Sequence, residues 1–139
     1  MPAVRQPAYV LDSHAVVAFL GQESGFEEVT DLLRKARSGR IKLMMSGVNL
    51  GEVMYVSERN RGLSGAQKTL AKIEELPIEI VAVDKQLCLE AAHIKALCPI
   101  AYADCFAAAL TEREDAVLVT GDPEFSILES NLSLPVYWL

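Results

Sequence analysis

The sequence predicts an α/β fold in which a mainly parallel central sheet is flanked by helices. Short apolar runs alternate with longer stretches of helical periodicity along the chain. Strands that are separated by helices pair in parallel, and a parallel sheet is buried on both faces. No linker, internal repeat or low-complexity tract interrupts this pattern. We therefore expect one domain over residues 1–139.

In the first half of the chain, the pattern predicts two strands and four helices. The helix that starts at 24 is amphipathic and ends at Ser38-Gly39. Ser46 and Ser64 are residues that favour helix N-caps, and Pro77 stops the second of the helices that they begin. The predicted elements are a strand at 7–11, helices at 13–20 and 24–38, a strand at 41–45, and helices at 46–59 and 64–76.

The second half of the chain continues the alternation. Asp84 follows an apolar run and is typical of a helix cap, and Cys98-Pro99 ends the helix that it begins. The predicted elements are a strand at 78–83, helices at 84–97 and 101–114, a strand at 116–120, a short helix from Pro123, and a strand at 135–138.

Composition favours a globular protein that contains no membrane-spanning segment. The chain is 51% hydrophobic over 139 residues, enough for a sizeable core. No apolar run approaches the roughly 20 residues of a membrane-spanning helix, and the first seven residues lack the apolar stretch of a secretion signal. We expect a soluble, cytoplasmic protein. Its odd number of cysteines, Cys88, Cys98 and Cys105, favours reduced thiols that fill core space.

Four carboxylates lie where an uncompensated charge is costly. Asp12 and Asp122 follow apolar strand-like runs, and ligands gather outside the carboxyl ends of strands in open α/β sheets. Glu52 and Asp104 lie on apolar helix faces, with no Lys or Arg within one turn. A buried carboxylate must be protonated, paired with a distant cation or bound to metal. The four acids together predict a metal site.

Each acid also has a simpler interpretation. Asp12 could cap the helix that begins at Ser13, and Asp122 could cap the one that begins at Pro123. Glu52 could form a salt bridge with Arg59, two turns along its face. His14 lies close enough in sequence to Asp12 to reach the site, or it could pack or face water.

The distribution of charge permits an anionic partner despite a net charge of −6. Residues 1–69 carry nine Lys/Arg against seven Asp/Glu, a net of +2, whereas residues 70–139 carry four against twelve, a net of −8. Several cations, namely Arg34, Lys35, Arg37, Arg40 and Lys42, crowd one helix end and the turn after it. They could complement the helix C-terminus or bind phosphates of RNA.

Four segments of the sequence resemble the motifs of one family, the PIN-domain ribonucleases, and among them the small VapC-type toxins. Asp12 lies in Tyr-Val-Leu-Asp-Ser, and Glu52 in Ser-Gly-Val-Asn-Leu-Gly-Glu-Val. Asp104 lies in Ala-Tyr-Ala-Asp-Cys-Phe-Ala-Ala-Ala, and Asp122 in Leu-Val-Thr-Gly-Asp-Pro-Glu-Phe. The resemblance covers essentially the whole chain. One departure is Gly121, where the family often has Asn between the Thr and the Asp.

The resemblance implies a PIN-like α/β/α sandwich and metal-dependent endonucleolytic cleavage of RNA that leaves 5′-phosphate and 3′-hydroxyl ends. Mg²⁺ or Mn²⁺ would suit oxygen ligands of this kind. We expect Asp12, Glu52 and Asp104 to hold the main ion, and Asp122 to bind a second ion or to act through water. Ser13 and Thr120 would orient these carboxylates as hydrogen-bond donors.

The resemblance also implies partners. A VapB-type antitoxin would restrain the enzyme by placing a segment, often with an Arg, into the acidic site. Residues 16–20 and 53–56 could form a groove for that segment, or they could belong to the core. A homodimer through the 46–76 region is expected too, and the RNA substrate would be tRNA, rRNA or mRNA.

Two other functions fit parts of the pattern. A catalytically inactive module of the same fold could use the acidic pocket to bind a protein or a regulatory metal. A response-regulator receiver also has acids at strand ends, but the paired acids after its early strand and the Lys after a late strand are missing here. Metal-dependent RNA cleavage would separate the nuclease from the inactive module.

Overall fold

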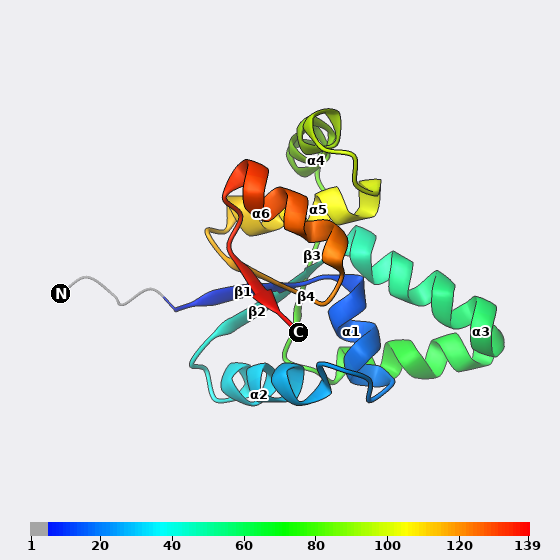
Figure 1. The fold of residues 1–139 in the computed structure, drawn as a ribbon. Coiled ribbons are helices and arrows are strands. Elements are labelled where there is room, and N and C mark those ends of the chain that lie inside the picture. Colours follow the sequence, from blue (N-terminus) through cyan, green and yellow to red (C-terminus); the bar gives the residue numbers. More distant parts are fainter. Residues whose placement is uncertain (1–5) are drawn as a thin grey trace.

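The structure, a computed structural model, describes residues 6–139 and places helices on both sides of a central sheet (Figure 1). The strands are β1 (Ala8–Leu11), β2 (Lys42–Ser46), β3 (Glu79–Val81), β4 (Val117–Thr120) and β5 (Val136–Trp138). The helices are α1 (Ser13–Leu20), α2 (Phe26–Arg37), α3 (Gly47–Glu74), α4 (Lys85–Leu97), α5 (Tyr102–Arg113) and α6 (Ser126–Leu132), and a 3₁₀ turn, η1 (Pro123–Phe125), precedes α6.

All pairings in the five-stranded sheet are parallel, and the strand order is β3-β2-β1-β4-β5. The chain builds outward from β1 in one direction, through β2 and β3, and then returns to add β4 and β5 on the other side. Leu11 at the end of β1 pairs with Val119 near the end of β4. The predicted fold class is therefore confirmed, and the reversal of strand order falls between β1 and β4, where α/β folds commonly bind ligands.

Two apolar layers lie on the two faces of the sheet. Val10 and Leu118 point toward α4, α5 and α6, whereas the next residue of each strand, Leu11 and Val119, points toward α1, α2 and α3. This alternation follows from the two-residue period of a strand. Figure 1 shows the resulting sandwich, with α4, α5 and α6 above the sheet and α2 below it. Both faces are buried, which explains the nearly continuous apolar runs of the strands.

The two helices predicted over 46–59 and 64–76 correspond to the two arms of α3. The arms are separated by a sharp break at Gly62, whose φ of 74° and ψ of 174° are not helical. The two arms form a hairpin that projects from the sheet (Figure 1). Ser57 on the first arm shares a hydrogen bond of 2.8 Å with Thr69 on the second.

Several local predictions are confirmed by contacts. Ser46 and Asp84 cap α3 and α4, since their side chains accept hydrogen bonds from Asn49 N and Leu87 N. Cys98 and Cys105 are free and buried in the core, and Cys88 packs against it. In residues 6–139 no single helix is long and apolar enough to cross a membrane; α4 and α5, bent at 116°, meet that test only as a pair, by length and composition. The expectation about a secretion signal concerns in part residues 1–5, outside the described range.

Candidate metal centre

The acids predicted from the sequence meet at the carboxyl edge of the sheet. Asp12 follows β1 and Asp122 lies just beyond β4, and these two strands are neighbours. Glu52 lies in the second turn of α3, which starts directly after β2, the strand on the other side of β1. Asp104 lies in the first turn of α5. Four separate segments thus bring their carboxylates to one place.

Asp12 is fixed by two hydrogen bonds and is only 1% exposed. One carboxylate oxygen accepts a bond of 2.8 Å from the backbone N–H of Ala15, so Asp12 caps α1 as the simpler interpretation predicts. The other accepts the hydroxyl of Thr120 at 2.5 Å. The same hydroxyl accepts the backbone N–H of Asp122 at 3.0 Å. Thr120 therefore connects the two strand-end acids, in keeping with the orienting role expected for it.

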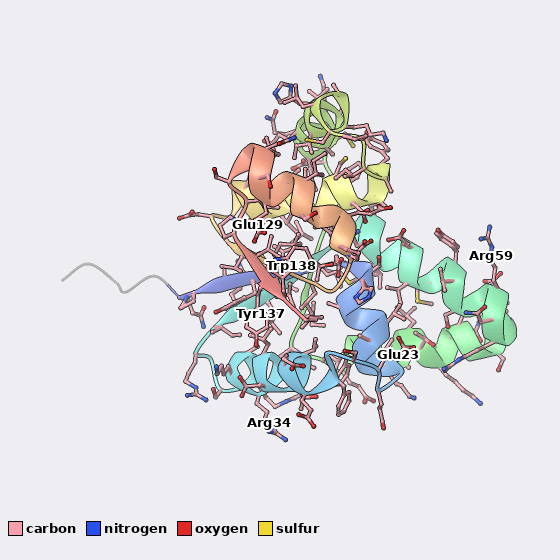
Figure 2. The ribbon with its side chains drawn as sticks, viewed as in Figure 1. Glu23, Arg34, Arg59, Glu129, Tyr137 and Trp138 are labelled. Atoms are coloured by element: carbon pink, nitrogen blue, oxygen red, sulfur yellow. The ribbon has the colours of Figure 1, made fainter. Side chains whose placement is uncertain are left out.

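Glu52 contacts α1 through a hydrogen bond from the hydroxyl of Ser13. Its expected alternative partner, Arg59, instead stacks over the ring of Tyr55, with its guanidinium carbon 5.0 Å from the ring centroid. The predicted salt bridge between Glu52 and Arg59 is therefore not formed, and no other ion pair in residues 6–139 involves Glu52. Arg59 lies toward the end of the hairpin's first arm, away from the sheet (Figure 2).

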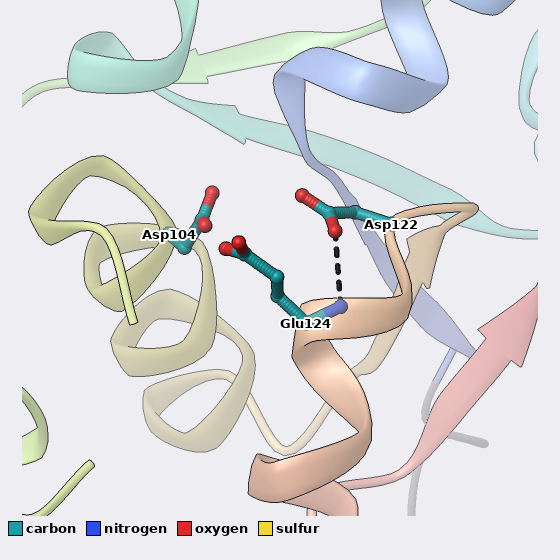
Figure 3. Close-up of side chains that lie close together, drawn as sticks. All are labelled: Asp104, Asp122 and Glu124. Atoms are coloured by element: carbon teal, nitrogen blue, oxygen red, sulfur yellow. Dashed lines mark hydrogen bonds between the residues drawn. The ribbon is translucent and has the colours of Figure 1, made fainter. Parts of the chain in front are cut away.

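A fifth acid, Glu124, joins the group. Single carboxylate oxygens of Asp104, Asp122 and Glu124 lie within 4.8 Å of one another, and Figure 3 shows the three side chains converging from α5, the end of β4 and η1. Asp122 also caps η1, because its carboxylate accepts the backbone N–H of Glu124 at 3.0 Å. That tight turn brings Glu124 toward α5. The only sequence signal for it was its place in Asp-Pro-Glu after the last acid.

Burial and mutual repulsion raise the pKa values of two of these carboxyl groups. The pKa of Asp12 rises to about 7, mainly because it is buried, although hydrogen bonds from Thr120 and Ala15 oppose the rise. The pKa of Asp104, which is 8% exposed, also rises to about 7 through burial and then through the negative charges of the other acids, namely Asp122, Glu52, Asp12 and Glu124. The charges of the four other acids therefore all act on Asp104.

No cation of the described chain neutralises this cluster. The ion pairs found in residues 6–139 involve other acids: Asp31 with Lys35, Glu79 with Lys42, and Asp84 with Arg113. Five carboxylates without a Lys or Arg partner leave a negative charge that a divalent cation would compensate. A donor set made only of carboxylate oxygens suits hard cations such as Mg²⁺, Mn²⁺ or Ca²⁺, so the residues present fit a metal of this class.

Asn49 connects two of the helices that carry the acids, and the sequence analysis assigned it no role. It is completely buried on α3, accepts the hydroxyl of Ser46 at 2.6 Å, and donates its amide to the carbonyl of Ala103 at 3.1 Å. Since Ala103 precedes Asp104, this bond joins the start of α3 to the start of α5. Its signal in the sequence was an amide on an otherwise apolar helix face, one turn before Glu52.

The basic residues predicted to contact RNA lie elsewhere. Arg34, Lys35 and Arg37 occupy the last turn of α2, and Arg40 follows in the loop before β2, which begins beside Ala8 at the amino end of β1. They are therefore at the edge of the sheet opposite the acids, and Figure 2 shows Arg34 on the outer side of α2. Lys35 is paired with Asp31 in the helix. At these positions the cations complement the negative C-terminal end of the α2 dipole. RNA binding by them stays a prediction.

A pocket lies between α1 and the α3 hairpin. Val17 and Leu20 of α1 and Val53 and Val56 of α3 contribute apolar side chains to its lining, and Glu23, Asn60 and Arg61 contribute polar ones. Val16 and Ala18, in contrast, are buried in the core. Some side chains of the two apolar stretches therefore line a pocket and others belong to the core, and binding of an antitoxin segment in this pocket stays a prediction. The pocket starts one residue beyond Glu52 along α3.

Comparisons with known proteins agree with this architecture. The family model described as PIN domain matches residues 9–130. No curated protein sequence matches the chain. Among solved structures, VapBC2 from Rickettsia felis, bound to a DNA fragment from its promoter, has a chain that is 17% identical with a TM-score of 0.73, and the match covers 94% of this chain and 97% of that one.

Two further structures are similar over most of their length. VapBC-1 from nontypeable Haemophilus influenzae matches at 19% identity and a TM-score of 0.69, with 94% of this chain and 97% of that chain covered. VapC20 of Mycobacterium tuberculosis, described as a sarcin-ricin loop cleaving toxin, matches at 16% identity and a TM-score of 0.66, with 86% and 93% covered. At these identities the structural matches establish the fold.

Proposed function

Because the chain belongs to the PIN-domain family, we propose that it is a metal-dependent endoribonuclease and the toxin of a VapBC-type toxin–antitoxin pair. The observation that carries this proposal is a cluster of carboxylates: Asp104, Asp122 and Glu124 lie within 4.8 Å of one another, and Asp12 and Glu52 are close enough for their charges to act on Asp104. None of these acids is paired with a Lys or Arg in residues 6–139. Structural likeness to VapBC complexes is consistent with the proposal.

In the proposed site, Asp12, Glu52 and Asp104 hold the main cation, Mg²⁺ or Mn²⁺, and Asp122 holds a second cation or acts through water. Glu124 joins Asp122, since the two carboxylates lie together beside Asp104. When bound, a cation of this class supplies an activated water for attack on the phosphate and stabilises charge on the leaving oxygen. The products would carry 5′-phosphate and 3′-hydroxyl ends.

The surrounding residues have the tasks of holding and shaping this cluster. Thr120 and the first turn of α1 fix both oxygens of Asp12, and Ser13 holds Glu52. Asn49 fixes the distance between the helices that carry Glu52 and Asp104. Such supporting hydrogen bonds keep like-charged ligands in place before a cation arrives, and the repulsion that they resist favours the binding of that cation.

The proposed partners follow the same assignment. A VapB-type antitoxin would insert a segment into the pocket between α1 and α3, with a cationic side chain reaching the acids beyond Glu52. RNA, whether tRNA, rRNA or mRNA, would be the substrate, and the enzyme would act in the cytoplasm as a homodimer. The basic residues at the end of α2 would touch only an RNA large enough to reach the opposite edge of the sheet.

The proposal is tested by RNA cleavage with Mg²⁺ or Mn²⁺, assayed on total tRNA and rRNA. We expect Asp104→Asn to lower the rate by on the order of a hundredfold or more, since even changes to residues that merely support metal ligands cost about 10–100-fold. Asp31→Asn, which alters an exposed acid paired with Lys35, is the matched control and should cut normally. Sequencing of RNA ends after brief expression of both variants would identify the target.

A wild-type protein that binds Mn²⁺ but cuts no RNA would refute the nuclease. That outcome would favour the inactive module, in which the same acids bind a regulatory metal or a protein. Cleavage that survives in Asp104→Asn would instead show that the acids are not the active site.

A further inference from the structure

His14 lies against the backbone of Gly121, at the edge of the acid cluster. A Cβ atom on residue 121 would stand 2.5 Å from Cε1 of the His14 ring, 3.1 Å from Nδ1 and 3.4 Å from Nε2. A side chain at this position would require the exposed His14 ring to shift. His14 is the second residue of α1 and is exposed, so its ring covers Gly121 from the solvent side.

Gly121 has no conformational reason to be glycine. Its φ lies outside the left-handed region, unlike the φ angles of Gly25, Gly39 and Gly62, which are 99°, 81° and 74°. Any residue could adopt its backbone conformation, but only glycine lets the imidazole stay where it lies. The two residues therefore form a matched pair across the gap between α1 and the end of β4.

The pair borders the acids directly. Gly121 lies between Thr120, whose hydroxyl donates to Asp12, and Asp122, whose backbone N–H donates to that same hydroxyl. His14 follows Ser13, which donates to Glu52. The imidazole thus lies on Gly121, next in the chain to residues that carry or contact Asp12, Glu52 and Asp122, and it is exposed to solvent.

The acid cluster offers an RNA phosphate no hydrogen-bond donor of its own. Its side chains are carboxylates, and none of them is paired with Lys or Arg in residues 6–139, so a phosphate that does not contact the proposed cation gains from a donor at this edge. An imidazole has an N–H donor whether it is neutral or protonated. It can therefore bind a phosphate oxygen without a change of its own charge.

We infer that His14 binds a phosphate of the RNA next to the one that is cleaved, and that Gly121 lacks a side chain so that the ring can occupy this position. The inference rests on the proposed function, since it assigns His14 a role in holding the same substrate. Through that contact His14 positions the RNA strand over the carboxylates.

The test compares three substitutions of His14 with a control at His93, the exposed histidine of α4. His14→Ala should raise the KM for RNA cleavage about tenfold with a smaller change in kcat, because hydrogen bonds to charged groups are worth that much. His14→Gln keeps an N–H donor and should restore much of the affinity, whereas His14→Phe keeps only a ring and should not. His93→Ala should behave as wild type. Mn²⁺ affinity, measured by calorimetry, should be the same in all variants.

A second variant tests the pairing itself. Gly121→Ala should displace the ring and raise KM in the same direction, and it should add little in a His14→Ala background, because the two changes remove one contact. Binding of a fluorescein-labelled RNA to the Asp104→Asn protein, followed by anisotropy, should show the same order of affinities without cleavage.

The outcomes separate this inference from the proposed function. If wild type cuts RNA and His14→Ala has an unchanged KM, the inference is overturned and the nuclease stands. If His14→Phe, but not His14→Gln, restores affinity, the ring stacks on a base and the phosphate contact is refuted. If wild type neither binds nor cuts RNA, the proposed function fails and the inference fails with it.

Discussion

At the scale of single residues, Asp12 shows that a carboxylate can cap a helix and also lie within an acid cluster. One carboxylate oxygen caps α1 and the other accepts the hydroxyl of Thr120. Asp122 likewise caps η1 and lies within the acid cluster. For these two residues, a capping role therefore does not exclude a place in the acid cluster. The same oxygens that organise the local backbone are brought to the carboxyl edge of the sheet.

The repulsion among the acids predicts that the metal-free protein is destabilised by its own site. In a chelator at neutral pH, Asp104→Asn should raise the free energy of unfolding by on the order of 1 kcal/mol or more, because it removes a buried charge next to like charges. Urea denaturation would measure this difference. Asp31→Asn is the control and should give no gain, since Asp31 is exposed and paired with Lys35.

The effect of Asp104→Asn should depend on pH in a defined direction. The pKa of Asp104 is about 7 in the folded protein, against 3.8 as its ordinary value. Between these values the unfolded chain has lost the proton and the folded chain has kept it, so the stability of wild type falls as the pH rises through that window. The advantage of Asp104→Asn in chelator should be small near pH 4 and largest above pH 7. An advantage that is constant over this range would contradict the electrostatic explanation.

The residues that sequence analysis missed have roles that depend on neighbours distant in the chain. Asn49 acts by donating to Ala103, 54 positions further along the chain. Glu124 reaches Asp104 only because η1 turns it back toward α5. Glu52 and Asp104 could be singled out because each is a carboxylate on an apolar helix face, and Asp12 and Asp122 because each follows an apolar strand-like run. Asn49 and Glu124 could not, because no local pattern shows which helix end they face.

At the scale of elements, sequence periodicity predicted the break in α3 only approximately. Ser64 suggested the start of a new helix, and the backbone breaks two residues earlier, at Gly62. The φ and ψ of Gly62 lie in a region that is nearly restricted to glycine. The hairpin matters for function because its first arm carries Glu52 and lines the pocket beside α1.

Two glycines of α3 should respond in opposite ways to the same substitution. Gly62→Ala should destabilise the protein by about 1–3 kcal/mol, because alanine is strained in that backbone conformation. Gly51→Ala should stabilise it by about 0.4–1 kcal/mol, since Gly51 is helical and a Cβ there would meet no atom within 4 Å. Thermal melts of both variants would measure the two shifts. A stabilising Gly62→Ala would mean that the hairpin does not break at this residue.

At the scale of the whole molecule, the strand order decides where the site lies. The alternation of strands and helices predicts a parallel sheet, but it allows many orders of the strands. The structure places β4 next to β1, and this single choice brings Asp122 beside Asp12 at the point where the strand order reverses. The periodicity of the chain could predict the elements and the two buried faces. It could not predict which strand ends meet, because that depends on packing between distant segments.

The basic residues illustrate the same limit. None of the site's acids is close in sequence to the basic residues Arg34, Lys35, Arg37 and Arg40. Only the direction of α2 in the structure shows that these cations lie at the opposite edge of the sheet. Charge counts along the chain cannot reveal this separation. The electrostatic balance of the site is therefore set by the acids themselves and by whatever cation or partner joins them.

Anomalous diffraction from crystals soaked in Mn²⁺ would show whether these carboxylates hold a divalent cation. We predict an anomalous peak coordinated by carboxylate oxygens of Asp12, Glu52 and Asp104, with any second peak beside Asp122 and Glu124. Well-ordered crystals with no Mn²⁺ among these five side chains, or with each carboxylate paired to a Lys or Arg instead, would contradict it.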